Sequence, residues 1–595
     1  MSKMKKLKLE QYLLFFLILL FCALFINRLF YTIDTSDEAF YCTTGYRLIK
    51  GNFPFGDMWE PNAGTSFIMA PFLYLRSFFV SDGEGIVLYL RISYFVLSFL
   101  PAFAIYKYAK LTIDKGYALL LGLFFLFYAP FQLVNFSYNN LAITFTTLSL
   151  CMLFMGMRTQ NKLYYYLSGV NISLAILSYP TIIYLGLFLF LVVLLSGQFI
   201  HKSFFSCQYY ILGGLSVGIP VILYLSYNIG MRNVFINLSI ISSIDNAHIF
   251  SFNYVLQKLY EALIYFKTLV SQNGRIFIGY WLVMLIAIFN NKLNNIAKYF
   301  IVFYPIICCY CNVNFISNQP RYVANRVMMF YVFSIMLSAI FSLLLSKDKI
   351  RMIRKNAFEW CISLLLYFIL AVSSGGGARN AASGLVFASV LSIKIFIEVI
   401  DDKLAEISTF KFKKIEIYLL LLFIVGCEIF TFYKAPYSDS KIPCLTAKVE
   451  SGIFKGIYTY AERKQHIEDL GNVIKSLEDK GETILVLYHS CYAYLMVDMV
   501  PKAPSSWGCY DYQAYKFDNQ NLFMEYLGRK ENTPKNIIIV DIPKQFDYPL
   551  ERMERYKPYY KTLNKFVDDH YNYIGQYEQG LSGKVIKYKL KNNSI

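Results

Sequence analysis

Long apolar runs recur through most of this 595-residue chain. Each is close to the roughly 20 residues that a helix needs to cross a bilayer. We expect about thirteen such spans, near 11–31, 86–106, 117–134, 138–157, 164–180, 181–200, 208–227, 276–290, 299–313, 327–345, 358–372, 380–400 and 417–433. The hydrophobic share of 56% and the mean hydropathy of +0.43 exceed what a water-soluble domain needs. The sequence therefore predicts a polytopic α-helical membrane protein.

The basic residues are distributed unevenly between alternate loops. The formal net charge is +18, and Lys and Arg gather in loops near 107–115, 158–162, 292–298, 346–356 and 401–414. This pattern is typical of cytoplasmic loops. No nucleic-acid motif accompanies it, so we expect no nucleic-acid partner.

The basic N-terminus, MSKMKKLKLE, precedes an apolar run without a cleavage site, which predicts an uncleaved first helix. We expect a plasma-membrane protein with its N-terminus inside and its C-terminus outside.

The residues after the last span form a different kind of sequence. They combine a charged amphipathic stretch, 461–480, with the strand-like runs TILVLY (483–488) and NIIIV (536–540). Helix and strand in this order predict a small α/β domain. We therefore divide the chain into a membrane module, 1–433, and an extracytoplasmic domain, 434–595. Cys491 and Cys509 flank a turn-rich stretch of this domain, and a disulfide between them would require an oxidising compartment.

The first predicted outer loop, 32–85, carries an acidic pair at the mouth of the first span. Asp37 and Glu38 begin an amphipathic stretch that ends at Gly51. We expect this stretch to be a helix lying along the membrane surface. Acids at its N-terminus would stabilise it as caps, and a carboxylate there could also take a proton from an acceptor hydroxyl. The residues alone leave both roles open.

This loop resembles the first outer loop of GT-C membrane glycosyltransferases, most closely the protein O-mannosyltransferase and lipid A aminoarabinose transferase group. The resemblance rests on Asp37, Glu38, Tyr41, the GNFP element (51–54), Asp57, and the prolines Pro61 and Pro71 on the return to the second span. It implies an enzyme that moves a hexosyl or pentosyl group, with inversion, from a polyprenyl-phosphate donor. The acceptor would be a glycan, lipid or protein of the cell surface or cell wall. Asp37 would be the catalytic base, and Glu38 a second candidate or an orienting residue.

A phosphate leaving group needs cations as charge develops on it. On the predicted outer loops we assign this role to Arg321, Arg326 and Arg379, the last beside three glycines. The resemblance adds Lys267 and Arg275. The long outer loop 228–275 that supplies them also holds Lys258.

Three further residues of the first loop are candidate contacts to the acceptor or the sugar: Asp57, Trp59 and Glu60. The second outer loop, VNFSYNN (134–140), carries no carboxylate. This departs from the pattern of metal-dependent GT-C enzymes, so we assign no metal ligand. We expect no required cofactor, and dependence on a divalent metal stays open.

Two other functions fit part of the pattern. A polysaccharide polymerase or ligase also uses polyprenyl-linked sugars but places its key residues in a large late loop, for which 228–275 is available. A lipid or solute transporter would bury charged residues in mid-span, and the sequence shows few. Neither alternative accounts for the Asp37–Glu38 pair.

Overall fold

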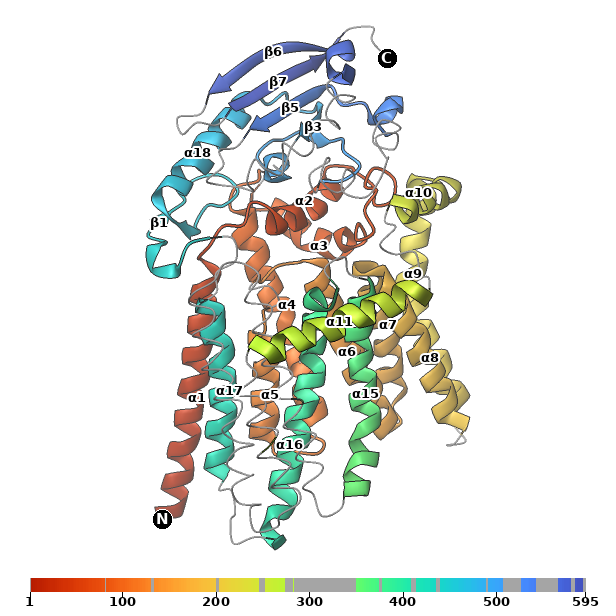
Figure 1. The fold of residues 1–595 in the computed structure, drawn as a ribbon, viewed down its shortest axis with the longest axis vertical. Coiled ribbons are helices and arrows are strands. Elements are labelled where there is room, and N and C mark those ends of the chain that lie inside the picture. Colours follow the sequence, from red (N-terminus) through yellow and green to blue (C-terminus); the bar gives the residue numbers. More distant parts are fainter. Residues whose placement is uncertain are drawn as a thin grey trace.

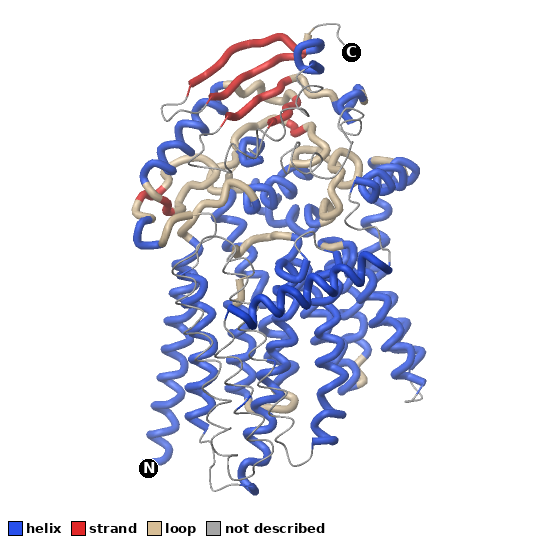
Figure 2. Tube along the Cα trace, viewed as in Figure 1, coloured by secondary structure: helices blue, strands red, loops and turns tan. Residues whose placement is uncertain are grey.

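A computed structural model describes residues 2–80, 82–129, 133–198, 203–244, 252–272, 349–373, 377–407, 414–434, 439–487, 491–506, 526–541, 565–578 and 584–591, with single positions at 282 and 336. Long helices stand side by side in a bundle, and a β-sheet lies beyond one end of it (Figure 1, Figure 2). We call that end the sheet end. The opposite end, where the first helix begins, is the basal end.

The bundle contains α1 (Ser2–Leu29), α4 (Ile86–Ala109), α5 (Lys115–Phe127), α6 (Tyr138–Thr159), α7 (Lys162–Ser178), α8 (Ile183–Gln198), α9 (Ser203–Asn228), α15 (Lys349–Ser373), α16 (Val386–Ile407) and α17 (Lys414–Lys434). Five described stretches are long and apolar enough to cross a membrane: Ile86–Ala109, Tyr138–Thr159, Ser206–Asn228, Asn356–Ser373 and Lys414–Tyr433. All five coincide with predicted spans. The total of about thirteen is not confirmed, and the spans predicted at 276–290, 299–313 and 327–345 fall outside the described residues.

The proline at position 180 separates two helices. The helix α7 ends at Ser178, a short 3-10 turn η2 (Pro180–Ile182) follows, and α8 starts at Ile183. Proline has no backbone N–H and fixes its own φ, so it suits the start of a helical turn. The boundary between the predicted spans 164–180 and 181–200 is thus a turn between two helices.

Among the described helices that precede the C-terminal part, four lie outside the upright bundle: α2 (Asp37–Ile49), α3 (Thr65–Ser77), α10 (Met231–Ile244) and α11 (Phe252–Gln272). The helix predicted after the first span is confirmed as α2, and Gly51 ends it with a φ of 88° that favours glycine. The predicted return loop was wrong in part, because α3 forms there with Pro71 inside it. In Figure 1, α11 crosses the bundle obliquely near its sheet end.

The C-terminal part contains α18 (Ala461–Ser476), a short pair β1 (Ala447–Lys448) and β2 (Tyr458–Thr459), and a mixed five-stranded sheet. The sheet order is β4-β3-β5-β7-β6, with β3 (Thr483–Leu487) parallel to both β4 (Val500–Pro501) and β5 (Asn536–Asp541). The predicted strands at 483–488 and 536–540 are confirmed as β3 and β5. The antiparallel β6 (Tyr571–Glu578) and β7 (Lys584–Leu590) were not predicted, although KVIKYKL shows the period-two alternation of a strand.

A buried histidine on α18 should make the stability of this region depend on pH. Burial, and then the nearby Arg463, lower the pKa of His466 to about 4. The unfolded chain therefore binds a proton at a higher pH than the folded chain does. Acidification from about pH 7 to about pH 5 should cost roughly 2 kcal/mol of unfolding free energy. We expect His466→Leu to lose less stability over that range, measured by thermal unfolding of the purified protein. Equal losses in both proteins would contradict this assignment.

Charged side chains are also buried among the basal halves of the helices, contrary to the expectation of few. Glu359 of α15 pairs with Arg158 at the end of α6, at 2.7 Å. Within α16, Lys394 pairs with Glu398 at 2.9 Å, and both side chains are almost fully buried. Each charge has a partner of opposite sign, which offsets much of the cost of its burial.

Candidate active site

The start of α2 is organised by an acid to which the sequence analysis gave no role. Asp34 is buried, and its carboxylate accepts hydrogen bonds from the backbone N–H of Ser36 at 3.2 Å and of Glu38 at 2.8 Å. It also accepts one from the Ser36 hydroxyl at 2.7 Å. Ser36, at the cap position, makes no side-chain cap bond. Asp34 thus satisfies backbone groups that would otherwise be exposed at the helix start, and the cap does not depend on Asp37.

Glu38 points into the protein. It is fully buried, and its two carboxylate oxygens accept hydrogen bonds from the Nε and Nη2 atoms of Arg91 on α4, at 2.7 and 2.5 Å. Arg91 also donates to the backbone carbonyls of Leu29, Tyr31 and Thr32. This two-point ion pair fixes α2 against α1 and α4. Of the two roles predicted for Glu38, the geometry favours the orienting one.

Asp37 begins α2 and is partly exposed. Its carboxylate acts electrostatically on the hydroxyl of Tyr138, the first residue of α6. The side chains of Tyr41 and Asn139 also lie close to that hydroxyl. The Tyr138 ring lies 5.6 Å from the ring of Tyr41, edge to face.

A third tyrosine extends this group towards α15. The ring of Tyr179, between α7 and η2, lies 5.6 Å from that of Tyr138. The hydroxyl of Ser373, the last residue of α15, donates to the Tyr179 hydroxyl at 3.4 Å. We call Asp37, Tyr41, Tyr138, Asn139 and Tyr179 the tyrosine cluster. All five residues are partly exposed, so the ends of α2, α6 and α7 bring a carboxylate, an amide and three phenols to one accessible place.

The start of α6 is held rigidly beside Asp37. The Ser137 hydroxyl caps the helix by accepting from the Asn140 N–H at 3.1 Å. The Asn140 side chain donates to the carbonyls of Leu133 at 3.0 Å and Asn135 at 2.9 Å. The asparagine-rich segment that lacks a carboxylate therefore serves to fix Tyr138 and Asn139 in position.

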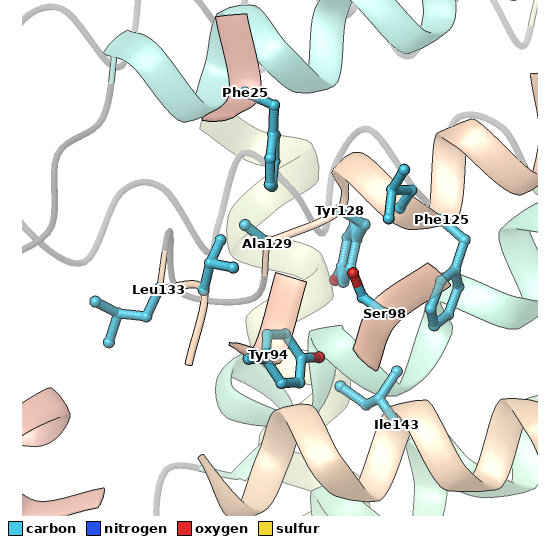
Figure 3. A pocket seen from close by; sticks show the side chains of 10 residues that line it. Phe25, Tyr94, Ser98, Phe125, Tyr128, Ala129, Leu133 and Ile143 are labelled. Carbon is cyan, nitrogen blue, oxygen red and sulfur yellow. The ribbon is translucent and has the colours of Figure 1, made fainter. Parts of the chain in front are cut away.

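A small cavity lies within the bundle, bordered by α1, α4, α5 and α6 (Figure 3). Its volume is about 10 Å³, and Tyr94 and Ser98 of α4 contribute hydroxyl groups to its wall. The Tyr94 hydroxyl lies 3.0 Å from that of Thr144 on α6. A volume of this size holds about one water molecule. It is too small for a sugar, so the accessible surface around Asp37 is the better candidate.

The three predicted acceptor contacts are instead engaged with the C-terminal part. Asp57 forms an ion pair with Lys502 at 2.9 Å. Glu60 is buried and accepts from the Ser506 N–H at 2.8 Å, and burial raises its pKa despite the nearby Arg47. Trp59 is only 4% exposed, donates to the Gly56 carbonyl and packs edge-on against Tyr526. These side chains join the first loop to the C-terminal part, and a sugar stacked on Trp59 is not compatible with its burial.

The same junction continues along α2. Arg47 is fully buried and donates to the Asn52 side chain at 2.9 Å and to the Ala503 carbonyl at 2.6 Å. The Sγ atom of Cys491 lies 3.4 Å from the Ser36 carbonyl oxygen. Its proposed partner, Cys509, lies outside the described residues. The C-terminal part thus fixes both ends of α2.

No protein-family model matches this chain, and no curated protein matches it either. Among solved structures, it is similar to the oligosaccharyltransferase AglB of Archaeoglobus fulgidus in complex with an inhibitory peptide and a dolichol-phosphate. The identity is 11%, the match covers 98% of this chain and 75% of that one, and the TM-score is 0.47. It is also similar to the apo form of the oligosaccharyltransferase from that organism. There the identity is 12%, the match covers 99% of this chain and 75% of that one, and the TM-score is 0.48. Similarity at this level assigns neither a substrate nor a mechanism.

The predicted phosphate-binding cations are only partly placed. Lys267 lies on the exposed surface of α11, and Arg379 belongs to the 3-10 segment η5 (Gly377–Leu385). Arg275, Arg321 and Arg326 lie outside the described residues.

Lys258 of α11 is a further candidate for contact with the phosphate. Its side chain is 12% exposed, pairs with Glu261 at 3.0 Å, and lies beside Gly377 at the start of η5. Lys258 was visible in the sequence as one cation among several, and only the packing of α11 against η5 distinguishes it.

The described residues hold no group of three His, Cys, Asp or Glu side chains arranged to bind a metal ion. Dependence on a divalent metal stays as open as the sequence left it.

Proposed function

We propose that this chain is an integral membrane glycosyltransferase of the GT-C class that moves a sugar from a polyprenyl-phosphate carrier to an acceptor hydroxyl. One observation carries the proposal. Asp37 is a partly exposed carboxylate at a helix start, beside Tyr138, while the neighbouring acids Asp34 and Glu38 are buried and fully engaged. A carboxylate kept accessible within a rigid frame suits a base that must meet a substrate.

The proposed reaction is a direct displacement. The acceptor oxygen attacks the anomeric carbon as Asp37 takes the hydroxyl proton, and the bond from that carbon to the phosphate oxygen breaks. Polyprenyl phosphate leaves with the bonding electrons, and the configuration at the sugar inverts. Tyr41, Tyr138 and Tyr179 present phenol rings and hydroxyls, which can stack on a sugar ring and hydrogen-bond its hydroxyls.

The donor phosphate is proposed to lie near η5. Lys258 beside Gly377 would face the charge that develops on the leaving phosphate, with Arg379 in the same segment. In this proposal residues 434–595 form an extracytoplasmic domain over the sheet end of a plasma-membrane bundle, and the acceptor, a surface glycan, lipid or protein, enters between the two.

The direct test compares cells that carry the intact gene with cells in which it is disrupted. Loss of the transferase should leave one polyprenyl-phosphate sugar unused, so that it accumulates by an order of magnitude or so, as expected when a catalysed step is removed. Lipid extracts analysed by mass spectrometry measure this and identify the sugar. Identical lipid profiles in the two strains would argue against the proposed function.

A further inference from the structure

A second site lies at the basal end of the bundle, away from the tyrosine cluster. A cavity of about 430 Å³ opens there, lined by Leu111, Thr112, Arg158, Thr159 and Glu359. These residues come from the connection between α4 and α5, the end of α6, and the first half of α15. The proposed glycosyltransferase reaction does not use this cavity.

The charges inside the cavity leave a donor available. Glu359 accepts two hydrogen bonds from the Nη2 atom of Arg158, at 2.7 and 2.9 Å, and one from the Tyr108 hydroxyl. Its negative charge is thereby neutralised. The Nη1 atom of Arg158 is buried and has no hydrogen-bond partner among the described residues. Because an unpaired buried guanidinium nitrogen is costly, a bound anion would satisfy it.

Positive charge is concentrated at the rim. Lys107 and Lys110 stand in the last turn of α4 and just after it, and Lys115 begins α5. Partial desolvation, and then the ammonium groups of Lys107 and Lys115, lower the pKa of Lys110. Three cations that flank the cavity residues Leu111 and Thr112 in the chain favour an anionic ligand.

An exposed apolar stripe on α4 leads to the same place. Ile92, Val96, Phe99 and Phe103 recur at helical spacing on α4 and are all at least 40% exposed. Leu111 follows in the chain, two residues beyond the end of α4 at Ala109. Leu111, which is 45% exposed, also lines the cavity. The Lys107 ammonium lies 5.0 Å from the centre of the Phe103 ring, as expected where a basic side chain follows an apolar surface to its edge. In a membrane this stripe meets acyl chains.

We infer that this basal cavity binds one anionic phospholipid, with its phosphate among Arg158, Lys107 and Lys110 and an acyl chain along the α4 stripe. The cations alone would suit any phosphate. The apolar stripe on α4, followed by Leu111, favours a lipid over a soluble anion. This lipid differs from the proposed sugar donor in position, because the cavity lies at the basal end of the bundle and the donor is proposed to lie near η5.

Native mass spectrometry of the full-length protein tests the inference, with dimyristoyl phosphatidylglycerol, dimyristoyl phosphatidylcholine or inorganic phosphate added. We expect phosphatidylglycerol to be retained. The double variant Lys107→Gln/Lys110→Gln should bind it about 10-fold or more weakly, since each basic residue near an anionic lipid contributes roughly a tenfold factor or somewhat less. Arg158→Lys, which keeps the charge opposite Glu359 but loses the guanidinium donors, should also weaken retention.

Lys475→Gln, on α18 at the far end of the molecule, is the matched control for loss of charge and should retain the lipid as wild type does. Three results would overturn the inference: equal retention of phosphatidylcholine, displacement of the lipid by inorganic phosphate, or unchanged retention in the double lysine variant. The thermal unfolding temperature of each variant establishes that it is folded, so weakened binding is separable from misfolding.

Discussion

Asp37→Asn should abolish sugar transfer while leaving the protein folded. The amide cannot take the proton of the acceptor hydroxyl, and loss of a general base lowers rates by about 100- to 10,000-fold. The helix start should survive, because Asp34 supplies the cap that holds α2. The measurement is transfer of radiolabelled sugar from a polyprenyl-phosphate donor by membranes that carry equal amounts of each protein.

Two variants sharpen this result. Glu84→Gln removes another acid of the first loop, one whose carboxylate pairs with the exposed Lys455, and should transfer at nearly the wild-type rate. Asp37→Glu keeps the carboxylate but displaces it, and should retain more activity than the asparagine variant. If Asp37→Asn membranes transfer sugar as fast as wild type, Asp37 is not the base.

Arg91→Met should produce the largest loss of stability. It would leave the fully buried carboxylate of Glu38 without its partner, and removing one member of such a pair costs about 3–5 kcal/mol. Three backbone carbonyls of the segment after α1 lose a donor as well. The measurement is the thermal unfolding temperature of the purified protein in detergent.

The partner substitutions separate the ion pair from the carbonyl contacts. Glu38→Leu combined with Arg91→Met removes both charges and should recover part of the lost stability, because no unpaired charge remains buried. Arg76→Met is the matched control. Arg76 donates to the carbonyls of Asp82 and Glu84 without a described carboxylate partner, so its loss should be smaller. Equal losses in Arg76→Met and Arg91→Met would contradict a dominant role for the buried pair.

Local pattern predicted much of the fold. The apolar runs at 86–106, 138–157, 208–227, 358–372 and 417–433 all coincide with long helices, since a span depends only on its own length and hydrophobicity. The amphipathic periodicity of 38–50 likewise predicted α2, and the apolar runs at 483–488 and 536–540 predicted β3 and β5. Each of these signals lies within a single stretch of sequence.

The roles of individual side chains were less accessible. Asp57, Trp59 and Glu60 looked like substrate contacts, because acids and an aromatic in a turn-rich loop are typical of a binding site. In the folded chain they meet Lys502, Pro504 and Ser506, more than 440 positions away. Nothing in the sequence near either segment indicates the other.

The sequence by itself determined that this is a membrane helical protein with an acidic pair at the start of an interfacial helix. Only the tertiary structure decided the contacts and the exposure of each acid. Asp34 accepts hydrogen bonds from the backbone of α2, and Glu38 forms an ion pair with Arg91. Asp37 is partly exposed beside Tyr138. The physical reason is that hydropathy and helical periodicity act over neighbouring residues, whereas the burial of a charge depends on a partner supplied by another helix. Glu38 is buried and paired because α4 places the guanidinium of Arg91 against it.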